Sequence, residues 1–389
     1  MNEATRRFIE IHANDDVHLL ALKGSKDPDV DVPLALTQID GFQRARTKLP
    51  TWARTPGIVW PPHLALEQCS SEQTAQYKAR LAGVGHRFVD LTGGFGVDFA
   101  AIAPGFIDSV YVEQQEDLCN IASKNFKTLR LQRIKTICAD TTRYLQTMPP
   151  ADLILIDPAR RDIHGARTYS IADCTPNLLP LKETLLEKAP RVMLKLSPML
   201  DWRKAVKDIG PHRVSQVHIV SVNNECKELL LLLETNASPL QLVCANDGTT
   251  ESFTQEDLQH RTSGYAPATA GHYLYEPNAS LMKAGCFAPL ARRYGAAPIA
   301  PDSHLFVSAR AVNFPGRRFL IENISGLNRR ELGKALHGLC RANISVRHFP
   351  LGADALRQRL RLSEGGDTYI FATTRADGKH IIIFCKKEK

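Results

Sequence analysis

The chain has 389 residues, of which 43% are hydrophobic and 23% are charged, as in ordinary soluble globular proteins. This length exceeds what a single hydrophobic core usually supports, so two or three domains are expected. No apolar run reaches the roughly 18 residues of a membrane-spanning helix, and the N-terminus has no apolar signal-peptide core. Nine cysteines without a C-x-x-C pair argue against a disulfide framework or a zinc site. We therefore expect a cytoplasmic protein that has no metal and no membrane partner.

The net charge of +8 is concentrated at one end of the chain. Residues 316–389 contain 15 Lys and Arg against 7 Asp and Glu, whereas the preceding residues contain 34 of each kind. A local excess of positive charge is typical of surfaces that bind polyanions, most often nucleic acids. The same excess also occurs on solvated faces that keep a protein soluble.

Residues 1–80 form the first predicted region, which is helical with breaks at the prolines between Pro50 and Pro62. Its last helix has Ser71 as the expected N-cap. Lys78 lies on this helix, just before the first predicted strand.

The stretch RFVDLTGGFGVD, residues 87–98, runs from an apolar strand into a glycine-rich loop and then a helical pattern. Glycines allow a sharp turn and a close approach of ligand to backbone, and the helix start offers free N–H groups. Dinucleotide-binding folds require G-x-G-x-x-G, but Phe99 occupies the position of the third glycine. The acidic Asp90 in front of the loop also suits a cationic sulfonium better than a pyrophosphate.

This loop resembles motif I of the class I S-adenosylmethionine (SAM) methyltransferases, in the variant with Thr92 in place of the first glycine. The resemblance implies that the loop residues bind SAM, namely Asp90, Thr92, Gly93, Gly94 and Gly96. An ordinary tight turn between a strand and a helix remains the alternative.

Strands and helices alternate regularly from residue 87 to about 235, which predicts a mostly parallel sheet with helices on both faces. The expected strands end near residues 91, 113, 140, 157, 198, 222 and 234. Because the link between the last two is too short for a helical crossover, the seventh strand must run antiparallel. An antiparallel seventh strand is a feature that distinguishes methyltransferases from dinucleotide-binding folds.

Acidic residues stand at three successive strand ends, Asp90, Glu113 and Asp140. In open α/β sheets, ligands bind beyond the carboxyl ends of the strands. We expect Asp90 near the methionine part of SAM, Glu113 on the two ribose hydroxyls and Asp140 on the adenine amino group.

The fourth strand ends with Asp157, Pro158, Ala159 and Arg160. Many nucleic-acid methyltransferases carry D/N-P-P-Y/F/W here, where the acid accepts from a target amine and the ring stacks on the flipped base. We expect Asp157 to be catalytic, and Pro158 and Arg160 to contact substrate. The missing aromatic ring weakens the assignment to a base amine.

Lys195 interrupts the apolar fifth strand. A buried ammonium needs a carboxylate partner, and Asp157 on the neighbouring strand is the expected one. With Lys78 and Glu225 or Glu228, this pair looks like the Lys-Asp-Lys-Glu tetrad of ribose 2′-O-methyltransferases, in which a lysine of lowered pKa activates the hydroxyl. The alternatives for Lys195 are a structural ion pair and a phosphate ligand.

Cys226 lies in the same hairpin as these glutamates. Pyrimidine C5 methyltransferases use a thiolate nucleophile and carry D-P-P-R at the fourth strand. A cysteine that is part of the hydrophobic core, at the start of a buried strand, is the simpler interpretation.

Residues 236–272 are rich in Asn, Ser, Thr, Pro and Gly and are expected to form loops. From residue 317 we expect strand, helix, strand, helix and a final hairpin whose turn contains Asp377-Gly378. This α+β unit carries several arginines, among which Arg347 and Arg357 are candidate RNA contacts.

Seven segments together resemble a bacterial family of SAM-dependent methyltransferases with a THUMP-like C-terminal domain: EQCSSEQTAQYKA, DLTGGFGVD, DPARR, KLSPMLDW, YEPNASLMKAG, ISVRHFPL and GGDTYIFATT. The resemblance implies an α/β fold with a seven-stranded, Rossmann-like class I methyltransferase core. It also implies small α+β domains, ferredoxin-like and THUMP-like, at the C-terminus. The expected division is 1–80 (helical region), 81–272 (core), 273–316 (ferredoxin-like segment) and 317–389 (THUMP-like domain).

These features predict a SAM-dependent methyltransferase that acts on a nucleotide of tRNA or rRNA, at a base nitrogen or a ribose 2′-oxygen. An RNA-binding assembly factor that keeps a SAM pocket without catalysis is the alternative. A small-molecule methyltransferase or an NAD-type oxidoreductase would have no use for a separate basic domain.

Overall fold

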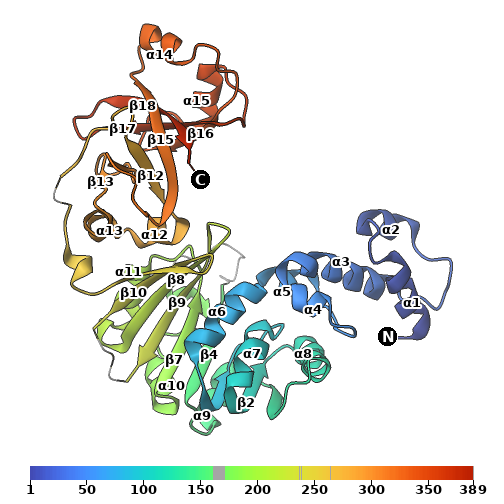
Figure 1. Ribbon diagram of the computed structural model, residues 1–389. Coiled ribbons are helices and arrows are strands. Elements are labelled where there is room, and N and C mark those ends of the chain that lie inside the picture. Colours follow the sequence, from blue (N-terminus) through green and yellow to red (C-terminus); the bar gives the residue numbers. More distant parts are fainter. Residues whose placement is uncertain (161–170, 236, 238, 263, 389) are drawn as a thin grey trace. The chain divides into compact units, whose positions relative to one another are not determined.

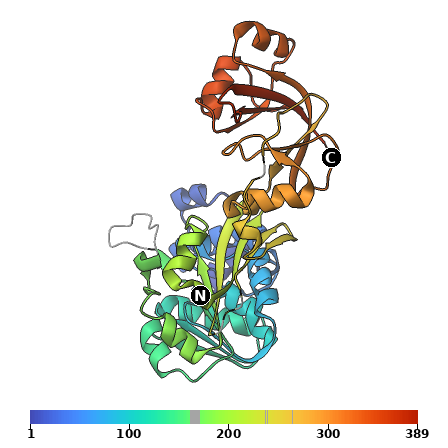
Figure 2. The same ribbon diagram turned by 90° about the vertical axis from the view of Figure 1, so that its left-hand side faces the viewer.

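The computed structural model describes residues 1–160, 171–235, 237, 239–262 and 264–388, except for the side chain of Arg160. They form two compact units: Met1–Val217 with Lys227–Leu240, and His218–Cys226 with Gln241–Lys389. Figures 1 and 2 show the secondary structure from two sides. Within the described ranges, no helix is long and apolar enough to cross a membrane.

The N-terminal region is helical, as predicted. Its helices are α1 (Glu3–His12), α2 (Val17–Lys23), α3 (Val32–Lys48), α4 (Pro50–Ala53), α5 (His63–Gln68) and α6 (Glu72–Ala82). Ser71 caps α6 by accepting a hydrogen bond from the Thr74 N–H. Trp52 and Trp60 pack in one hydrophobic cluster with Phe95, which lies in the loop after the first strand. The helical region is therefore packed against the glycine-rich loop.

The core follows the predicted alternation of strands and helices. Its elements are β1 (Gly85–Asp90), α7 (Val97–Ile102), β2 (Phe106–Glu113), α8 (Glu116–Thr128), β3 (Ile134–Cys138), α9 (Thr141–Thr147), β4 (Leu153–Ile156), α10 (Lys182–Lys188), β7 (Arg191–Leu196), α11 (Trp202–Ile209), β8 (Val214–Val222) and β9 (Glu225–Glu234). A short ladder of β5 (Ala159–Arg160) and β6 (Cys174–Thr175) was not predicted.

The strand order of the main sheet is β11-β10-β8-β9-β7-β4-β1-β2-β3. The pairs β1–β2, β1–β4, β2–β3 and β4–β7 are parallel, so their carboxyl ends meet at one edge. β9 lies between β7 and β8 and runs antiparallel to β7, which confirms the predicted antiparallel strand. Asn223 and Asn224, both with positive φ, make the two-residue turn between β8 and β9.

The sheet has nine strands rather than seven, because residues 236–272 are not only loops. This segment contains β10 (Gln241–Asn246) and β11 (Thr249–Phe253), which pair antiparallel. Asp247 and Gly248 form their turn with positive φ values of 48° and 88°. This Asp-Gly pair is a hairpin signal in the sequence. The polar composition of the segment favoured loops instead, so the hairpin was not predicted.

The second sheet has the order β13-β14-β12-β15-β18-β17-β16. Its unit contains β12 (Tyr273–Pro277), α12 (Ala279–Ala284), α13 (Phe287–Tyr294), β13 (Ala297–Pro298), β14 (Phe306–Ser308), β15 (Gly316–Ser325), α14 (Arg329–Ala335), β16 (Asn343–Arg347), α15 (Ala353–Leu360), β17 (Thr368–Thr374) and β18 (His380–Lys387). Leu274 and Val307 share one hydrophobic cluster with Phe319 and Phe371. The segments before and after residue 316 therefore share a sheet and a core.

The C-terminal half of this unit has the predicted order of elements, and Gly378 makes the final hairpin turn with a φ of 82°. The first helix of this half, α14, has seven residues. It ends at Ala335, and Gly338 follows with a φ of 76°.

Candidate functional site

The loop after β1 is fixed by close backbone packing. The Gly93 N–H donates to the carbonyl of Val112 on β2 at 2.9 Å. A Cβ atom on Gly93 would lie only 2.1 Å from the ring of Tyr111. Gly94 and Gly96 have φ values of 54° and 87°, a region that favours glycine. The packing and conformation of the loop thus favour glycine at positions 93, 94 and 96.

Glu113 ends β2 and holds this loop with its carboxylate. Its two oxygens accept hydrogen bonds from the Gly94 N–H at 2.9 Å and the Gln115 N–H at 2.8 Å. A carboxylate has about four acceptor sites, so two such bonds leave capacity for ligand hydroxyls. Glu113 therefore links the second strand end directly to the glycine loop.

Asp90 and Thr92 connect the loop to the neighbouring strand β4. The buried carboxylate of Asp90 accepts from the Thr92 N–H at 3.1 Å, and the Thr92 hydroxyl accepts from the Asp157 N–H at 2.6 Å. Burial raises the pKa of Asp90 well above its ordinary value, and the Thr92 N–H offsets this only in part.

Asp140 differs from its prediction, because β3 ends at Cys138 and Asp140 is the N-cap of α9. Its Oδ1 accepts from the Thr142 hydroxyl at 2.5 Å and the Arg143 N–H at 2.9 Å. These two donors lower the pKa of Asp140. The carboxylate lies two residues beyond the end of the third strand, where it caps the following helix.

Asp157 follows β4 directly, and Pro158 behind it is buried. The backbone of Arg160 belongs to β5, whereas its side chain lies outside the described atoms, so its predicted contact with substrate stays a prediction.

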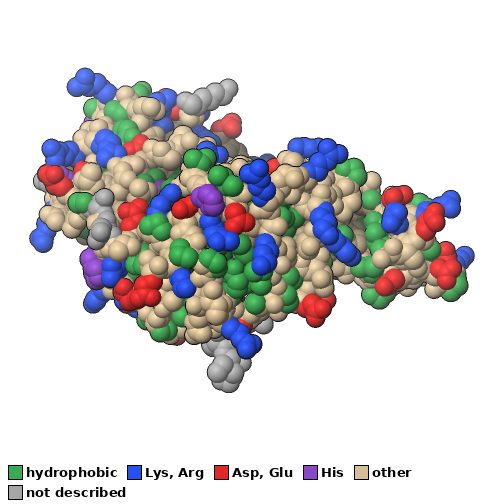
Figure 3. All heavy atoms as spheres, turned by 90° about the horizontal axis from the view of Figure 1, so that it is seen from below, with side chains coloured by type: hydrophobic (Ala, Val, Ile, Leu, Met, Phe, Trp, Pro, Cys, Tyr) green, Lys and Arg blue, Asp and Glu red, His purple; other side chains and the backbone are tan. Residues whose placement is uncertain are grey.

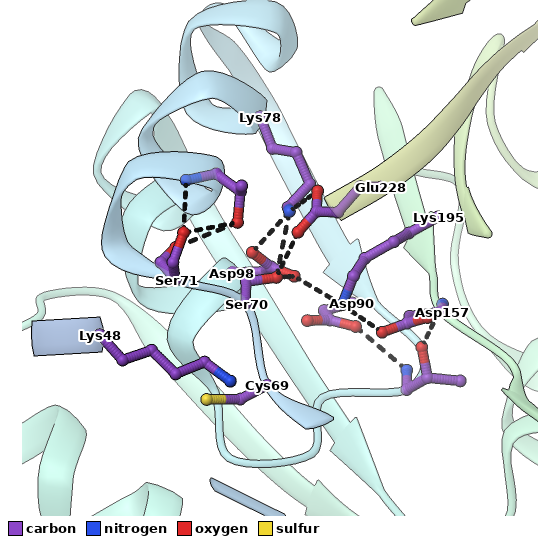
Figure 4. A network of polar contacts seen from close by, with 12 residues as sticks. Lys48, Cys69, Ser70, Ser71, Lys78, Asp90, Asp98, Asp157, Lys195 and Glu228 are labelled. Carbon is purple, nitrogen blue, oxygen red and sulfur yellow. Dashed lines mark hydrogen bonds and ion pairs between the residues drawn. The ribbon is translucent and has the colours of Figure 1, made fainter. Parts of the chain in front are cut away.

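Figure 4 shows a network of alternating charges at this edge. The Lys195 Nζ lies 2.5 Å from Asp157 Oδ2 and 3.5 Å from Asp98 Oδ2. The Lys78 Nζ lies 3.1 Å from Asp98 Oδ1 and also pairs with Glu228. The network thus runs from Asp157 through Lys195, Asp98 and Lys78 to Glu228.

Each member of the network comes from a different element. Lys78 lies on α6, Asp98 on α7, Asp157 after β4, Lys195 on β7 and Glu228 on β9. The structure brings together four residues that the sequence had grouped, and it selects Glu228 instead of Glu225 as the glutamate.

Asp98 and Ser70 were not predicted. The Ser70 hydroxyl lies 2.7 Å from Asp98 Oδ2, 3.0 Å from Glu228 Oε1 and 3.1 Å from the Lys78 Nζ. The available signal for Asp98 was its place in the first turn after Gly96. An acidic residue in a first helical turn is common for local reasons, so its contact with two lysines was not evident.

Only one member of the network is substantially exposed. The side chains of Lys78 and Glu228 are 0% and 4% exposed, those of Lys195 and Asp98 are 10% and 11%, and that of Asp157 is 38%. Asp157 is therefore the member of the network that is most accessible to solvent.

The electrostatics of the network keep Lys195 charged. Burial by itself would lower the pKa of Lys195, but the carboxylates of Asp157, Asp98 and Glu228 outweigh it, so the pKa lies well above its ordinary value. This corrects the expectation of a lysine with a lowered pKa. Burial raises the pKa of Asp157, which Lys195 offsets only in part.

Asp98 is shifted in the other direction. Burial would raise its pKa, but Lys78 and Lys195 together outweigh burial and hold the pKa of Asp98 below its ordinary value. The carboxylate between the two lysines is thus the ionised centre of the network.

The two predicted RNA-binding arginines are engaged in ion pairs within the second unit. Arg347 donates to the buried carboxylate of Glu276 at 2.8 Å, and Arg317 also pairs with Glu276. Arg357 pairs with Asp354 at 2.5 Å. Arg347 therefore has a structural role, whereas the partner of Arg357 is a largely exposed acid.

Other basic side chains of this unit are exposed and have no ion pair among its described residues: Arg329, Arg330, Lys334, Arg341, Arg359 and Arg361. They are better candidates for phosphate contacts. The face in Figure 3, which includes the N-terminal helices at its right end, instead shows both charge signs interspersed.

The surroundings of Cys226 are those of a structural cysteine. Burial raises the pKa of the Cys226 thiol, which donates to the carbonyl of Ala279 at 3.2 Å. No group of three His, Cys, Asp or Glu among the described residues could hold a metal ion.

Comparisons with known proteins cover almost the whole chain. Residues 273–315 match a family described as a ferredoxin-like domain, and residues 316–387 match one described as THUMP domain-like. A crystal structure from Porphyromonas gingivalis W83, described as a “putative methyltransferase”, is 32% identical with a TM-score of 0.89 and covers 99% of this chain and 98% of that one.

More remote structures match only part of the chain. An rRNA methylase from Streptococcus thermophilus is 16% identical, with 43% of this chain and 95% of that chain covered and a TM-score of 0.32. A methyltransferase structure from Streptococcus mutans in complex with SAH is 14% identical, with 42% and 96% covered and a TM-score of 0.32. A search of curated proteins found no match.

Proposed function

The chain belongs to the same family as the Porphyromonas gingivalis protein, and from that premise we propose that it is a SAM-dependent methyltransferase that acts on structured RNA. The cofactor would lie across the carboxyl edge of the main sheet. RNA would be held by the basic C-terminal unit.

One observation carries the cofactor assignment, namely the bond between Glu113 and the glycine loop. The Gly94 N–H donates to the Glu113 carboxylate, which joins the ends of β1 and β2 into one binding edge. An acid at this place accepts from the two hydroxyls of a ribose. Because Gly93, Gly94 and Gly96 have no side chains, the rest of a nucleoside could approach the backbone of this loop closely.

The residues present fit the sulfonium of SAM. The carboxylate of Asp90 accepts from the Thr92 N–H, and the backbone N–H of Asp157 donates to the Thr92 hydroxyl, so both acidic residues lie next to Thr92. When bound, SAM supplies an electrophilic methyl group. The protein's contribution is to hold acceptor and methyl group in line, because positioning dominates this kind of displacement.

The substrate class rests on the second unit. Residues 316–389 of this unit carry the charge excess of the chain, and several of their arginines and lysines are exposed. Contacts between such side chains and phosphates give binding that weakens steeply as the salt concentration rises. The THUMP domain-like match of residues 316–387 agrees with an RNA partner.

Calorimetry with the full-length protein tests the cofactor. We expect SAM and S-adenosylhomocysteine to bind and NAD not to bind. Glu113→Ala should weaken SAM binding at least tenfold, whereas Glu116→Ala, an exposed acid on α8, should leave it unchanged. Undiminished binding by the Glu113 variant would contradict the assignment.

Mass spectrometry of RNA tests the activity. We expect one methylated nucleoside to be present in tRNA or rRNA from wild-type cells and absent after deletion of the gene. If the protein binds SAM and RNA but the two RNA samples are identical, the alternative of an assembly factor without catalysis would be favoured.

A further inference from the structure

Asp157 and Lys195 are the residues that an acceptor would meet at the cofactor edge. Asp157 follows β4, and its N–H donates to Thr92 of the glycine loop. Its side chain is the most exposed of the charged network, whereas the other members are nearly buried. An acceptor that approached this edge would meet this carboxylate before the other members of the network (Figure 4).

The ammonium of Lys195 lies beside that carboxylate, and only two of its N–H donors are needed for its partners among the described residues. It has three donors, and its partners among the described residues are Asp157 and Asp98. The third donor can therefore serve an incoming acceptor atom. Asp157, Asp98 and Glu228 outnumber the two lysines of the network, so the ammonium stays charged without a substrate.

A fixed ammonium favours some acceptors over others. A neutral amine that attacks a methyl group becomes positively charged in the transition state, and a neighbouring ammonium opposes this. A hydroxyl becomes more negative as it loses its proton, and the same ammonium stabilises it. The arrangement therefore selects an oxygen.

The segment after Asp157 is consistent with this selection. Its residues Pro158, Ala159 and Arg160 contain no aromatic ring. A base that is turned out of its stack is commonly held between aromatic or apolar side chains. Positions 158–160 do not offer such a ring.

We propose, on the basis of the proposed function, that the acceptor is the 2′-hydroxyl of a ribose in RNA. Lys195 donates a hydrogen bond to the 2′-oxygen, and the carboxylate of Asp157 accepts the proton of the 2′-hydroxyl. The new bond joins the 2′-oxygen to the methyl carbon. The bond from that carbon to sulfur breaks, and its electron pair stays on the sulfur, which leaves S-adenosylhomocysteine.

Alkaline hydrolysis of the methylated RNA tests this acceptor. The full-length protein is incubated with [methyl-³H]SAM and total RNA from cells that lack the gene, and the RNA is then hydrolysed with alkali. A 2′-O-methyl group removes the nucleophile for chain cleavage, so we expect the label in alkali-resistant dinucleotides. Label in mononucleotides would show base methylation, which would overturn this inference but leave the proposed function intact. Absence of label in every RNA would overturn the proposed function, and the inference with it.

Two lysine variants separate the role of the charge from a role in folding. Lys195→Gln should lower kcat at least a hundredfold while the KM for SAM changes less than threefold, and Lys195→Arg should recover part of the rate. Lys204→Gln, which removes an exposed lysine paired with Asp208, is the control with an unchanged rate. An equal rate for Lys195→Gln and the wild type would overturn the role assigned to Lys195.

Discussion

The ammonium of Lys78, whose side chain is fully buried, lies 3.1 Å from Oδ1 of Asp98. Lys78 lies on α6 and Asp98 on α7, the helix that begins at the end of the glycine loop. This ion pair ties the N-terminal region to the segment that forms the proposed cofactor edge. It therefore couples the stability of the fold to the geometry of the site.

The first prediction concerns the pair of Lys78 and Glu228. Lys78→Met should destabilise the protein by about 3–5 kcal/mol, because it leaves a buried carboxylate without its partner. The double variant Lys78→Met/Glu228→Leu should lose less than the sum of the two single variants. Thermal unfolding followed by circular dichroism measures this, and additive losses would contradict a direct interaction. Lys204→Met, at an exposed site, should change stability by less than about 0.5 kcal/mol.

The second prediction concerns pH and Asp98. Because the pKa of Asp98 is lowered in the folded protein, its charge stabilises the fold above the unfolded pKa, and this stability is lost as the pH falls through the folded pKa. Asp98→Asn should therefore lower Tm at pH 7, and the gap to the wild type should narrow below about pH 4. The exposed Asp117→Asn serves as control and should show a small gap at both pH values. A Tm difference between Asp98→Asn and the wild type that increases in acid would contradict this prediction.

The third prediction concerns the packing of the glycine loop. Gly93→Ala would place a Cβ 2.1 Å from the ring of Tyr111. Such overpacking typically costs about 1–3 kcal/mol, and the displaced loop should bind SAM at least tenfold more weakly. Gly333→Ala on α14 meets no atom within 4 Å and should leave SAM binding unchanged in the same calorimetric titration. Equal affinities for the two variants would count against the loop as a cofactor site.

The fourth prediction separates RNA contact from structure in the C-terminal unit. Arg330→Ala removes an exposed charge from α14, so RNA affinity should fall, the slope of its salt dependence should decrease by about one, and Tm should be unchanged. Arg347→Ala removes a partner of the buried Glu276 and should lower Tm. Filter binding over a salt series and thermal unfolding measure the two effects. A loss of RNA affinity by Arg347→Ala without a loss of Tm would reverse the two roles.

The order of elements in the core followed from local patterns. Apolar runs ending in acids placed Asp90, Glu113 and Asp157 at strand ends, because parallel strands bury both faces and expose their ends. The charged Lys195 within an apolar strand predicted a carboxylate partner, and the Lys195–Asp157 distance of 2.5 Å confirms that pair. Local chemistry also predicted Ser71 as the cap of α6.

Other features were missed because they depend on competing local signals. The polar composition of residues 236–272 suggested loops, although Asp247-Gly248 closes the β10–β11 hairpin. Asp140 looked like a strand end but caps α9, since a short acidic side chain satisfies the first N–H groups of a helix.

The sequence by itself determined which chemical groups stand at the carboxyl ends of the strands, because the alternation of apolar and polar residues is a local property. The tertiary structure alone decided that Glu228, and not Glu225, belongs to the network, and that Asp98 and Ser70 complete it. These contacts join α6 and α7 to β7 and β9, which lie about a hundred residues or more further along the chain. The packing of helices and strands determines which buried charges come into contact, and this packing cannot be predicted from a local sequence pattern.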